Sequence, residues 1–247
     1  MLTNLFLKGR LRHDLTAEEK RALEGAASRT ITLGPRKTLV ERGRRLEHSY
    51  YLVEGTMLRY LDDRNGERQL VQVNLAGDFV DLHGYAMKRL DHSVETLTTV
   101  KLAEYPHRAI SSLVERFPHL ARALWFSTLL DAAMHREWIF MLGRLRGEGR
   151  IAFILAELIE RLRFIDRFDG RNFPIRLLQR DYAEACGISV VHANRCFKML
   201  KQDGILALRG EGRMDILDEA GLKRLAQFTP DHLYGHGELA LGSLRDR

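Results

Sequence analysis

The sequence predicts an α+β protein with an N-terminal β-barrel of the jelly-roll type, a long helix and a C-terminal winged helix-turn-helix. Short apolar runs separated by turn residues extend from about residue 30 to residue 105, which is typical of a sandwich or barrel. A long stretch with helical apolar spacing follows, and two short amphipathic segments then meet at Gly187. The predicted domains are the barrel at 1–117, the long helix at 118–146, the winged helix-turn-helix at 147–228 and a tail at 229–247.

The N-terminal part combines one capped helix with the barrel strands. Residues 14–27 are expected to form a short helix with Thr16 as its N-cap. Asn65-Gly66 predicts a hairpin turn, and Gly77-Asp78 a second turn. No helix is expected between the strands. The predicted strands lie within 50–53, 57–60, 69–73 and 94–102.

The long helix is the expected dimerisation element. Residues 108–116 predict a short helix that ends before Pro118, and the long helix begins there. One apolar stripe has near-heptad spacing, which suits a helix packed against its own symmetry mate in a homodimer. The alternative is a helix that packs only on its own barrel. The stripe consists of Leu120, Leu124, Met134, Trp138, Met141 and Leu145.

A hinge is expected after the long helix, at Gly147 and Gly149, where the helical pattern breaks. Another amphipathic helix is expected at 151–164, and Pro174 precedes the helix-turn-helix. The tail at 229–247 contains a proline and several glycines and is expected to be loosely ordered.

The segment 179–200 predicts the helix-turn-helix itself. Ala183 allows close approach of the two helices, Gly187 accepts a positive φ at the turn, and Ser189 can cap the second helix. The buried stripe is expected to consist of Tyr182, Cys186, Ile188, Ala193, Cys196, Phe197 and Leu200.

The outer face of the second helix has the chemistry of a base-recognition surface. Arg195 can form two hydrogen bonds with guanine, and Asn194 can do the same with adenine. Val190 or Val191 can pack on a thymine methyl group. Phosphate contacts are expected from Ser189, His192 and Lys198. The alternative is an ordinary helical hairpin with a solvated polar face.

A glycine-rich segment from Gly204 onwards predicts a two-stranded β-hairpin, the wing, with its tip at 210–212. Arg209 and Arg213 near the tip are expected to face the DNA backbone. Leu178 occupies the N-cap position of the first helix, where Ser or Thr is usual, so a weaker cap is expected there.

Composition agrees with a nucleic-acid partner and excludes several other classes. The 247 residues are 45% hydrophobic and carry a net charge of +6, which suits a polyanion. The sequence contains no membrane-spanning run, no signal-peptide pattern, no P-loop and no H-E-x-x-H or C-x-x-C spacing. It has two cysteines, Cys186 and Cys196, expected as buried thiols of a cytoplasmic protein, with a redox switch as the alternative. We therefore expect neither an enzyme nor a metal or other cofactor.

The order of barrel, long helix, glycine pair and winged helix resembles the Crp/Fnr superfamily, that of the cyclic-AMP receptor protein and the fumarate-nitrate reductase regulator. Matching phrases are Tyr51-Leu-Val-Glu-Gly, Gly77-Asp-Phe and Gly149-Arg-Ile-Ala, together with the helix-turn-helix. The resemblance spans roughly residues 15 to 220. It implies a cyclic-nucleotide-binding-like sensor barrel and a homodimeric transcription factor that binds double-stranded DNA, with RNA polymerase as an expected partner.

The departures from the family pattern concern the signal. Cyclic-AMP binders of this family carry Gly-Glu and then Arg-Ser or Arg-Thr in the barrel, where this chain has Asp81-Leu82 and the segment 90–93. Leu82 cannot bind a ribose hydroxyl and Asp91 repels a phosphate, so no cyclic-AMP binding is expected. Lys88 or Arg89 could compensate, but their spacing differs.

Other signals known in the family also lack their ligands. The iron–sulfur cluster of oxygen-sensing members needs cysteines that are missing before position 186. The histidines have no setting diagnostic of haem. Two alternatives remain for the signal: a small-molecule effector in a pocket between the barrel and the long helix, or regulation without a ligand. The resemblance places His83, Tyr85, Met134, His135 and Trp138 around such a pocket. A rival function is a small-ligand sensor module whose winged helix mediates protein contacts.

Overall fold

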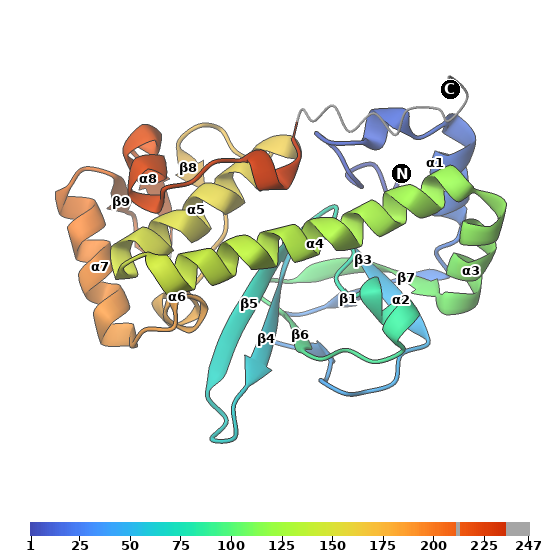
Figure 1. Ribbon diagram of the computed structural model, residues 1–247, viewed down its shortest axis with the longest axis horizontal. Helices are drawn as coiled ribbons and strands as arrows, with labels where there is room; N and C mark the ends of the chain where they lie inside the picture. The colour runs from blue at the N-terminus through green and yellow to red at the C-terminus, as the bar shows by residue number, and fades with distance from the viewer. Residues whose placement is uncertain (211–212, 236–247) are drawn as a thin grey trace.

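The computed structural model describes residues 1–210 and 213–235 and confirms the predicted α+β architecture. The long helix α4 (Pro118–Arg144) runs through the length of the molecule. The barrel lies along one side of α4, and helices α5 to α8 gather near its C-terminal end (Figure 1). Among the described residues, no helix combines the length and apolarity that a membrane span requires.

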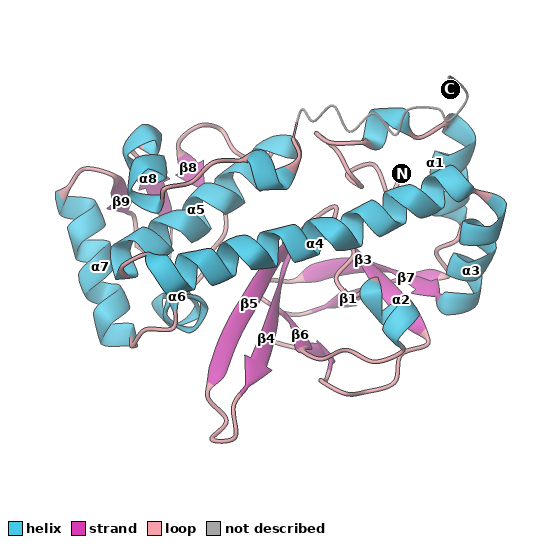
Figure 2. Ribbon diagram, viewed as in Figure 1, coloured by secondary structure: helices cyan, strands magenta, loops and turns pink. Residues whose placement is uncertain are grey.

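The barrel consists of two antiparallel sheets (Figure 2). One sheet has the strand order β1-β7-β3, and the other has the order β2-β6-β4-β5. The strands are β1 (Arg29–Leu33), β2 (Thr38–Val40), β3 (His48–Glu54), β4 (Thr56–Asp62), β5 (Arg68–Leu75), β6 (Ser93–Thr96) and β7 (Val100–Pro106).

The barrel differs from the sequence prediction at two points. The run expected at 94–102 is divided between β6 and β7, which lie in different sheets. The expectation of no helix between the strands is wrong, because α2 (His83–Met87) follows the turn after β5. At five residues, α2 is too short to leave a periodic apolar pattern. The hairpin turn is confirmed, with Gly66 at φ +80° between β4 and β5.

The N-terminal helix α1 (Ala17–Gly25) begins with the predicted cap. The Thr16 side chain accepts a hydrogen bond from the Glu19 amide, and Glu19 accepts one from the Thr16 amide. This reciprocal pair satisfies two amides that the first helical turn leaves unpaired. Helix α3 (His107–Arg116) follows β7 and leads into α4.

The predicted dimerisation stripe of α4 lies inside the single chain. All six residues are at most 6% exposed, so they pack within the protomer, although not only on the barrel as the alternative interpretation had it. Leu120 and Leu124 belong to a cluster with the N-terminal segment, and the other four pack with α5 and the helix-turn-helix. Periodicity showed that these residues share a face but not which neighbour covers it. The six residues are Leu120, Leu124, Met134, Trp138, Met141 and Leu145.

The C-terminal domain begins with α5 (Gly147–Phe164) rather than with a glycine hinge. The break in the helix falls at Leu145 and Arg146, which are both extended, with ψ of 151° and 170°. The remaining elements are β8 (Asn172–Phe173), α6 (Gln179–Cys186), α7 (Val190–Gln202), β9 (Leu206–Leu208), β10 (Met214–Ile216) and α8 (Glu219–Ala226).

The start of the predicted tail is packed, contrary to expectation. A short 3-10 helix covers Asp231–Leu233, and the Leu233 side chain is fully buried. The Arg10 guanidinium donates to the Leu233 carbonyl at 2.8 Å, which joins this segment to the N-terminal one. Residues 236–247 of the predicted tail, and 211–212 of the predicted wing tip, lie outside the described residues.

Candidate nucleic-acid interface

Helices α6 and α7 form the predicted helix-turn-helix. Gly187 follows α6 at φ +61°, the left-handed conformation that glycine adopts without strain. Ser189 caps α7 by accepting a hydrogen bond from the His192 amide at 3.2 Å. Six residues of the predicted buried stripe are at most 2% exposed, and the seventh, Ile188, is half-buried. The predicted stripe is therefore confirmed. The aromatic rings of Tyr182 and Phe197 meet edge-to-face at 5.0 Å between centroids.

The outer face of α7 is open to solvent along its whole length. Val190 and Val191 are 49% and 64% exposed, unusually high values for valine. The polar side chains predicted to contact DNA are exposed as well. They are Ser189, His192, Asn194, Arg195 and Lys198.

The two glycines expected to form a hinge instead permit close helix packing. A Cβ atom on Gly147 would lie 2.8 Å from Cys196 Sγ, and one on Gly149 would lie 3.1 Å from the Leu225 carbonyl oxygen. Both glycines are therefore needed where the first turn of α5 meets α7 and α8. The hinge prediction rested on the flexibility of glycine, and the structure uses its small size.

Two arginines that sequence analysis did not single out hold α5 in place. Arg150 donates hydrogen bonds to the carbonyl of Leu145 at 2.9 Å and to that of Cys186 at 2.8 Å. The second bond gives a partner to a carbonyl at the C-terminal end of α6. Arg161 is 4% exposed and joins α5 to the barrel, with hydrogen bonds to the Val73 carbonyl and to Asp78. Arg150 belongs to the phrase Gly149-Arg-Ile-Ala, which was the available signal for its role.

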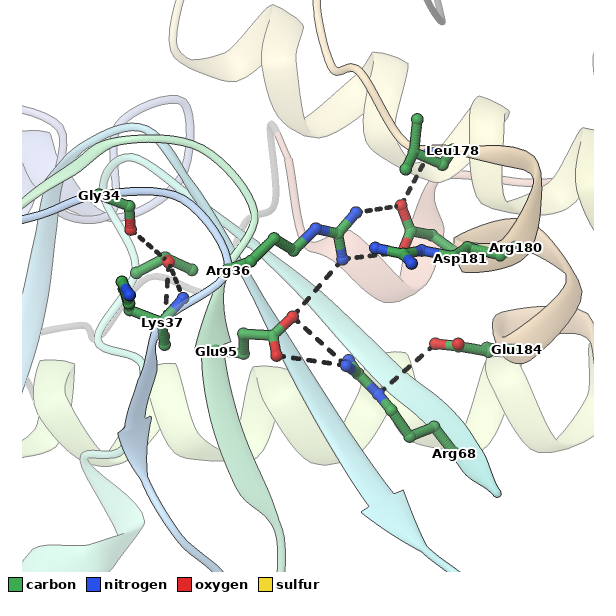
Figure 3. A network of polar contacts seen from close by, with 10 residues as sticks. Gly34, Arg36, Lys37, Arg68, Glu95, Leu178, Arg180, Asp181 and Glu184 are labelled. Carbon is green, nitrogen blue, oxygen red and sulfur yellow. Dashed lines mark hydrogen bonds and ion pairs between the residues drawn. The ribbon is translucent and has the colours of Figure 1, made fainter. Parts of the chain in front are cut away.

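The barrel also contacts the helix-turn-helix through a network of charged side chains, which we call the docking network (Figure 3). Arg36, in the turn before β2, forms two hydrogen bonds with Asp181 of α6, at 2.9 and 2.7 Å. Asp181 is 1% exposed and also accepts from the Leu178 amide, so the weak cap position is supported by this carboxylate. The hydrogen bonds to Asp181 raise the pKa of Arg36.

The docking network continues along the sheet through a second arginine. Arg68 of β5 lies 3.2 Å from Glu95 of β6 and 3.6 Å from Glu184 of α6 (Figure 3). Gln69 donates to the Ala185 carbonyl at 3.2 Å. The hairpin of β4 and β5 is thus fastened to the helix that supports α7.

The wing is a small antiparallel sheet in the order β8-β10-β9. Arg209 does not point freely towards a DNA backbone, because its guanidinium forms an ion pair with Asp215, which also binds Arg171. The contact between Arg209 and Asp215 was missed because Asp215 lies on β10, the strand that pairs with β9. Arg213 is exposed at the end of the hairpin.

An open cleft of about 360 Å³ separates the barrel from α4. Of the five side chains expected around a shared pocket, His83 and His135 line this cleft. Tyr85 points elsewhere, with its hydroxyl 3.0 Å from Ser111 Oγ. Met134 and Trp138 are buried, so the five do not line one cavity.

Buried polar groups lie beside the cleft. Arg59 of β4 is 1% exposed and forms an ion pair with Asp131 of α4 at 2.8 Å. Burial would raise the pKa of Asp131, but the Arg59 charge and hydrogen bonds from Gln72 and Arg59 lower it. Burial lowers the pKa of His83 to about 3 and that of His92 to about 4, so both imidazoles are neutral near pH 7.

The two cysteines do not suit the iron–sulfur cluster of oxygen-sensing family members. Cys186 and Cys196 are buried thiols in the helix-turn-helix, as predicted, and burial raises the pKa of both. A cluster needs several accessible thiolates, and the sequence has no other cysteine.

Known proteins share this architecture. Residues 30–117 match the cyclic nucleotide-binding domain, and residues 149–225 match the Crp-like helix-turn-helix domain. The structure of FixK2 from Bradyrhizobium japonicum has the same fold, with a TM-score of 0.74 at 19% identity, over 81% of this chain and 98% of that one. A barrel of the cyclic-nucleotide-binding type followed by a Crp-like helix-turn-helix therefore defines the class of protein.

Two curated relatives identify the family. The transcriptional activator protein FnrL of Cereibacter sphaeroides is 28% identical over 193 residues, which is 75% of each chain. The fumarate and nitrate reduction regulatory protein of Escherichia coli is 24% identical over 216 residues, 87% of this chain and 85% of the relative. The chain belongs to the Crp/Fnr family of transcriptional regulators.

Proposed function

We propose that the protein is a sequence-specific DNA-binding transcriptional regulator that acts as a homodimer on a palindromic operator. The observation that carries this proposal is the solvent-exposed outer face of α7, with Asn194 and Arg195 beside two exposed valines. These groups can form the bidentate hydrogen bonds and methyl contacts that distinguish base pairs in the major groove. A rival function, protein contacts made by the winged helix, does not explain this set of side chains.

A second apolar face of α4 supports the homodimer. We call Trp125, Leu129, Ala132 and Ile139 the outer stripe; three of them are among the most exposed large apolar residues of the chain, at 64%, 50% and 70%. Their spacing of four, three and seven residues matches one heptad seam, and Arg136 occupies the remaining position of that seam. Exposed apolar surface of this kind marks an interface. The outer stripe replaces the buried stripe as the proposed dimer contact.

Selection of bound sequences from random duplex DNA tests the function. The expected result is an enriched motif with two inverted half-sites about one helical turn apart, because two α7 helices related by a two-fold axis contact successive major grooves. Selection with and without small metabolites also shows whether an effector is required. Failure to enrich any duplex under either condition would favour the rival function.

Arg195→Ala is expected to weaken binding to the selected operator by about 1–3 kcal/mol and to relax the preference at one base pair of each half-site. The reason is the loss of a bidentate contact with a base. Fluorescence anisotropy with single-base operator variants measures both effects. Lys198→Ala is the matched control, since a phosphate contact contributes equally to all sequences. Unchanged affinity and selectivity of Arg195→Ala would refute the assigned role of α7.

Arg213→Ala is expected to weaken binding to all duplexes to a similar extent and to reduce the slope of log affinity against log salt by about one. The expected contact is with a phosphate, whose counterion is released on binding. Anisotropy titrations over a range of salt concentrations measure the slope. Loss of affinity confined to particular sequences would contradict the backbone role.

A further inference from the structure

A cluster of three side chains at the cleft is not explained by DNA binding. His83 begins α2, and Asp91 and His92 lie in the segment just before β6. Each offers one ligand atom, and these atoms all lie within 4.8 Å of one another. The His83 and His92 rings face each other at 5.1 Å between centroids, with 38° between their planes. All three residues line the cleft beside α4.

The hydrogen bonds of the cluster leave a buried imidazole nitrogen available. His92 Nδ1 lies 2.8 Å from Asp91 Oδ1, and the carboxylate, which has only acceptor atoms, accepts a hydrogen bond from the Nδ1–H of the ring. The lone pair then resides on Nε2, which is buried and has no hydrogen-bond partner among the described residues. The His92 side chain is 9% exposed, so bulk water does not compensate for the missing partner. An unpartnered basic nitrogen of this kind is expected where a ligand binds.

The charges around the cleft favour a cation. The charged residues that line it are one cation, Arg59, and two carboxylates, Asp91 and Asp131. Arg59 pairs with Asp131 rather than with Asp91, and it also donates hydrogen bonds to the carbonyls of Phe79 and Val80. The Asp91 side chain is 74% exposed, and no lysine or arginine within residues 1–210 and 213–235 forms an ion pair with it. The cleft lining therefore carries one more carboxylate than guanidinium.

We propose that His83 and His92 bind a divalent transition-metal ion at the cleft between the barrel and α4, with Asp91 orienting the His92 ring through Nδ1. Imidazole nitrogens are frequent ligands of zinc and iron(II), and a metal-bound histidine usually donates its other ring N–H to a carboxylate, as His92 does to Asp91. Two ligand atoms on one ion, each at about 2.1 Å, can be at most about 4.2 Å apart. The ligand atoms of the cluster lie within 4.8 Å of one another, so small side-chain rotations bring the imidazole nitrogens to that distance. Water or a small molecule would occupy the remaining coordination positions.

The location suggests why a regulator would bind metal there, on the basis of the proposed function. His135 and Asp131 of α4 line the same cleft, and Ala132 belongs both to the cleft and to the outer stripe. A divalent charge beside the Arg59–Asp131 ion pair changes the electrostatics of the contact between barrel and α4. The expected consequence is a change in operator affinity when metal binds.

Cobalt(II) is the probe, because its visible absorption bands report the ligand geometry directly. The tag-free, chelator-treated full-length protein is expected to bind one cobalt ion per chain, and zinc is expected to displace it. His92→Ala and Asp91→Ala are each expected to weaken binding by at least about tenfold. Asp91→Ala keeps the test decisive if His92→Ala does not fold, because Asp91 is exposed. His13→Ala is the matched control, since His13 also lies beside an aspartate, at 3.1 Å, but is 75% exposed elsewhere.

Three outcomes overturn the proposal: no cobalt bands, equal binding by Asp91→Ala, or the same loss with His13→Ala. The operator duplex is then titrated with wild-type protein and Asp91→Ala, with and without zinc. Affinity that responds to zinc in the wild type alone supports the regulatory role, and unchanged affinity refutes that role. Loss of all duplex binding in both states would instead refute the proposed DNA-binding function, so the two failures are distinguishable.

Discussion

Ile139→Glu is expected to convert the protein from a dimer to a monomer. Ile139 is 70% exposed in the single chain and lies near the C-terminal end of the outer stripe. A two-fold interface buries two copies of the side chain, so the substitution removes about 3–6 kcal/mol of apolar burial. It also places two carboxylates in an apolar contact. Analytical ultracentrifugation over a range of protein concentrations measures the dissociation constant.

The same variant is expected to lose most of its operator affinity, because a monomer occupies a single half-site. Leu217→Glu is the control: Leu217 is also exposed, at 49%, but lies outside α4. If Ile139→Glu remains dimeric at the concentrations where Leu217→Glu does, the outer stripe is not the dimer contact.

Arg59→Met is expected to lower the free energy of unfolding by about 3–5 kcal/mol, the cost typical of breaking a buried ion pair. The guanidinium joins β4 to α4 through Asp131 and satisfies two backbone carbonyls. The substitution leaves these acceptors without donors in a place that water reaches poorly. Urea unfolding followed by circular dichroism measures the change.

Two further variants separate the buried pair from a general effect of losing an arginine. Arg116→Met removes an exposed ion pair with Glu18, whose side chains are 74% and 62% exposed, and is expected to cost at most about 1 kcal/mol. Asp131→Asn added to Arg59→Met is expected to recover part of the loss, because it removes the unpaired carboxylate. Equal costs for Arg59→Met and Arg116→Met would contradict the anchoring role of Arg59.

Local signals in the sequence were sufficient for the helix-turn-helix and for most of the barrel. Gly187 and Ser189 act through their own backbone and through neighbours at most three residues away. The turn at Asn65-Gly66 is equally local. Such features depend on conformational preferences that a single sequence carries.

Features that depend on distant neighbours were missed or wrongly interpreted. Arg36 and Asp181 are 145 positions apart, and neither has a local pattern that indicates the other. Helix α4 has two apolar faces, and its 27 residues do not show which face the same chain covers. Gly147 was interpreted as a hinge because the helical pattern breaks there. Its packing role was missed because Cys196, the residue it lies against, belongs to another helix. The pairing of His83 with His92 was missed because the two rings approach each other only in the folded barrel.

Methylation interference on the selected operator tests most directly whether two α7 helices occupy successive major grooves. Dimethyl sulfate modifies guanine N7, which faces the major groove, and adenine N3, which faces the minor groove. We predict that guanine modification blocks binding in two clusters on one side of the duplex, about 10 base pairs apart. A single cluster, or interference confined to adenines, would contradict the account.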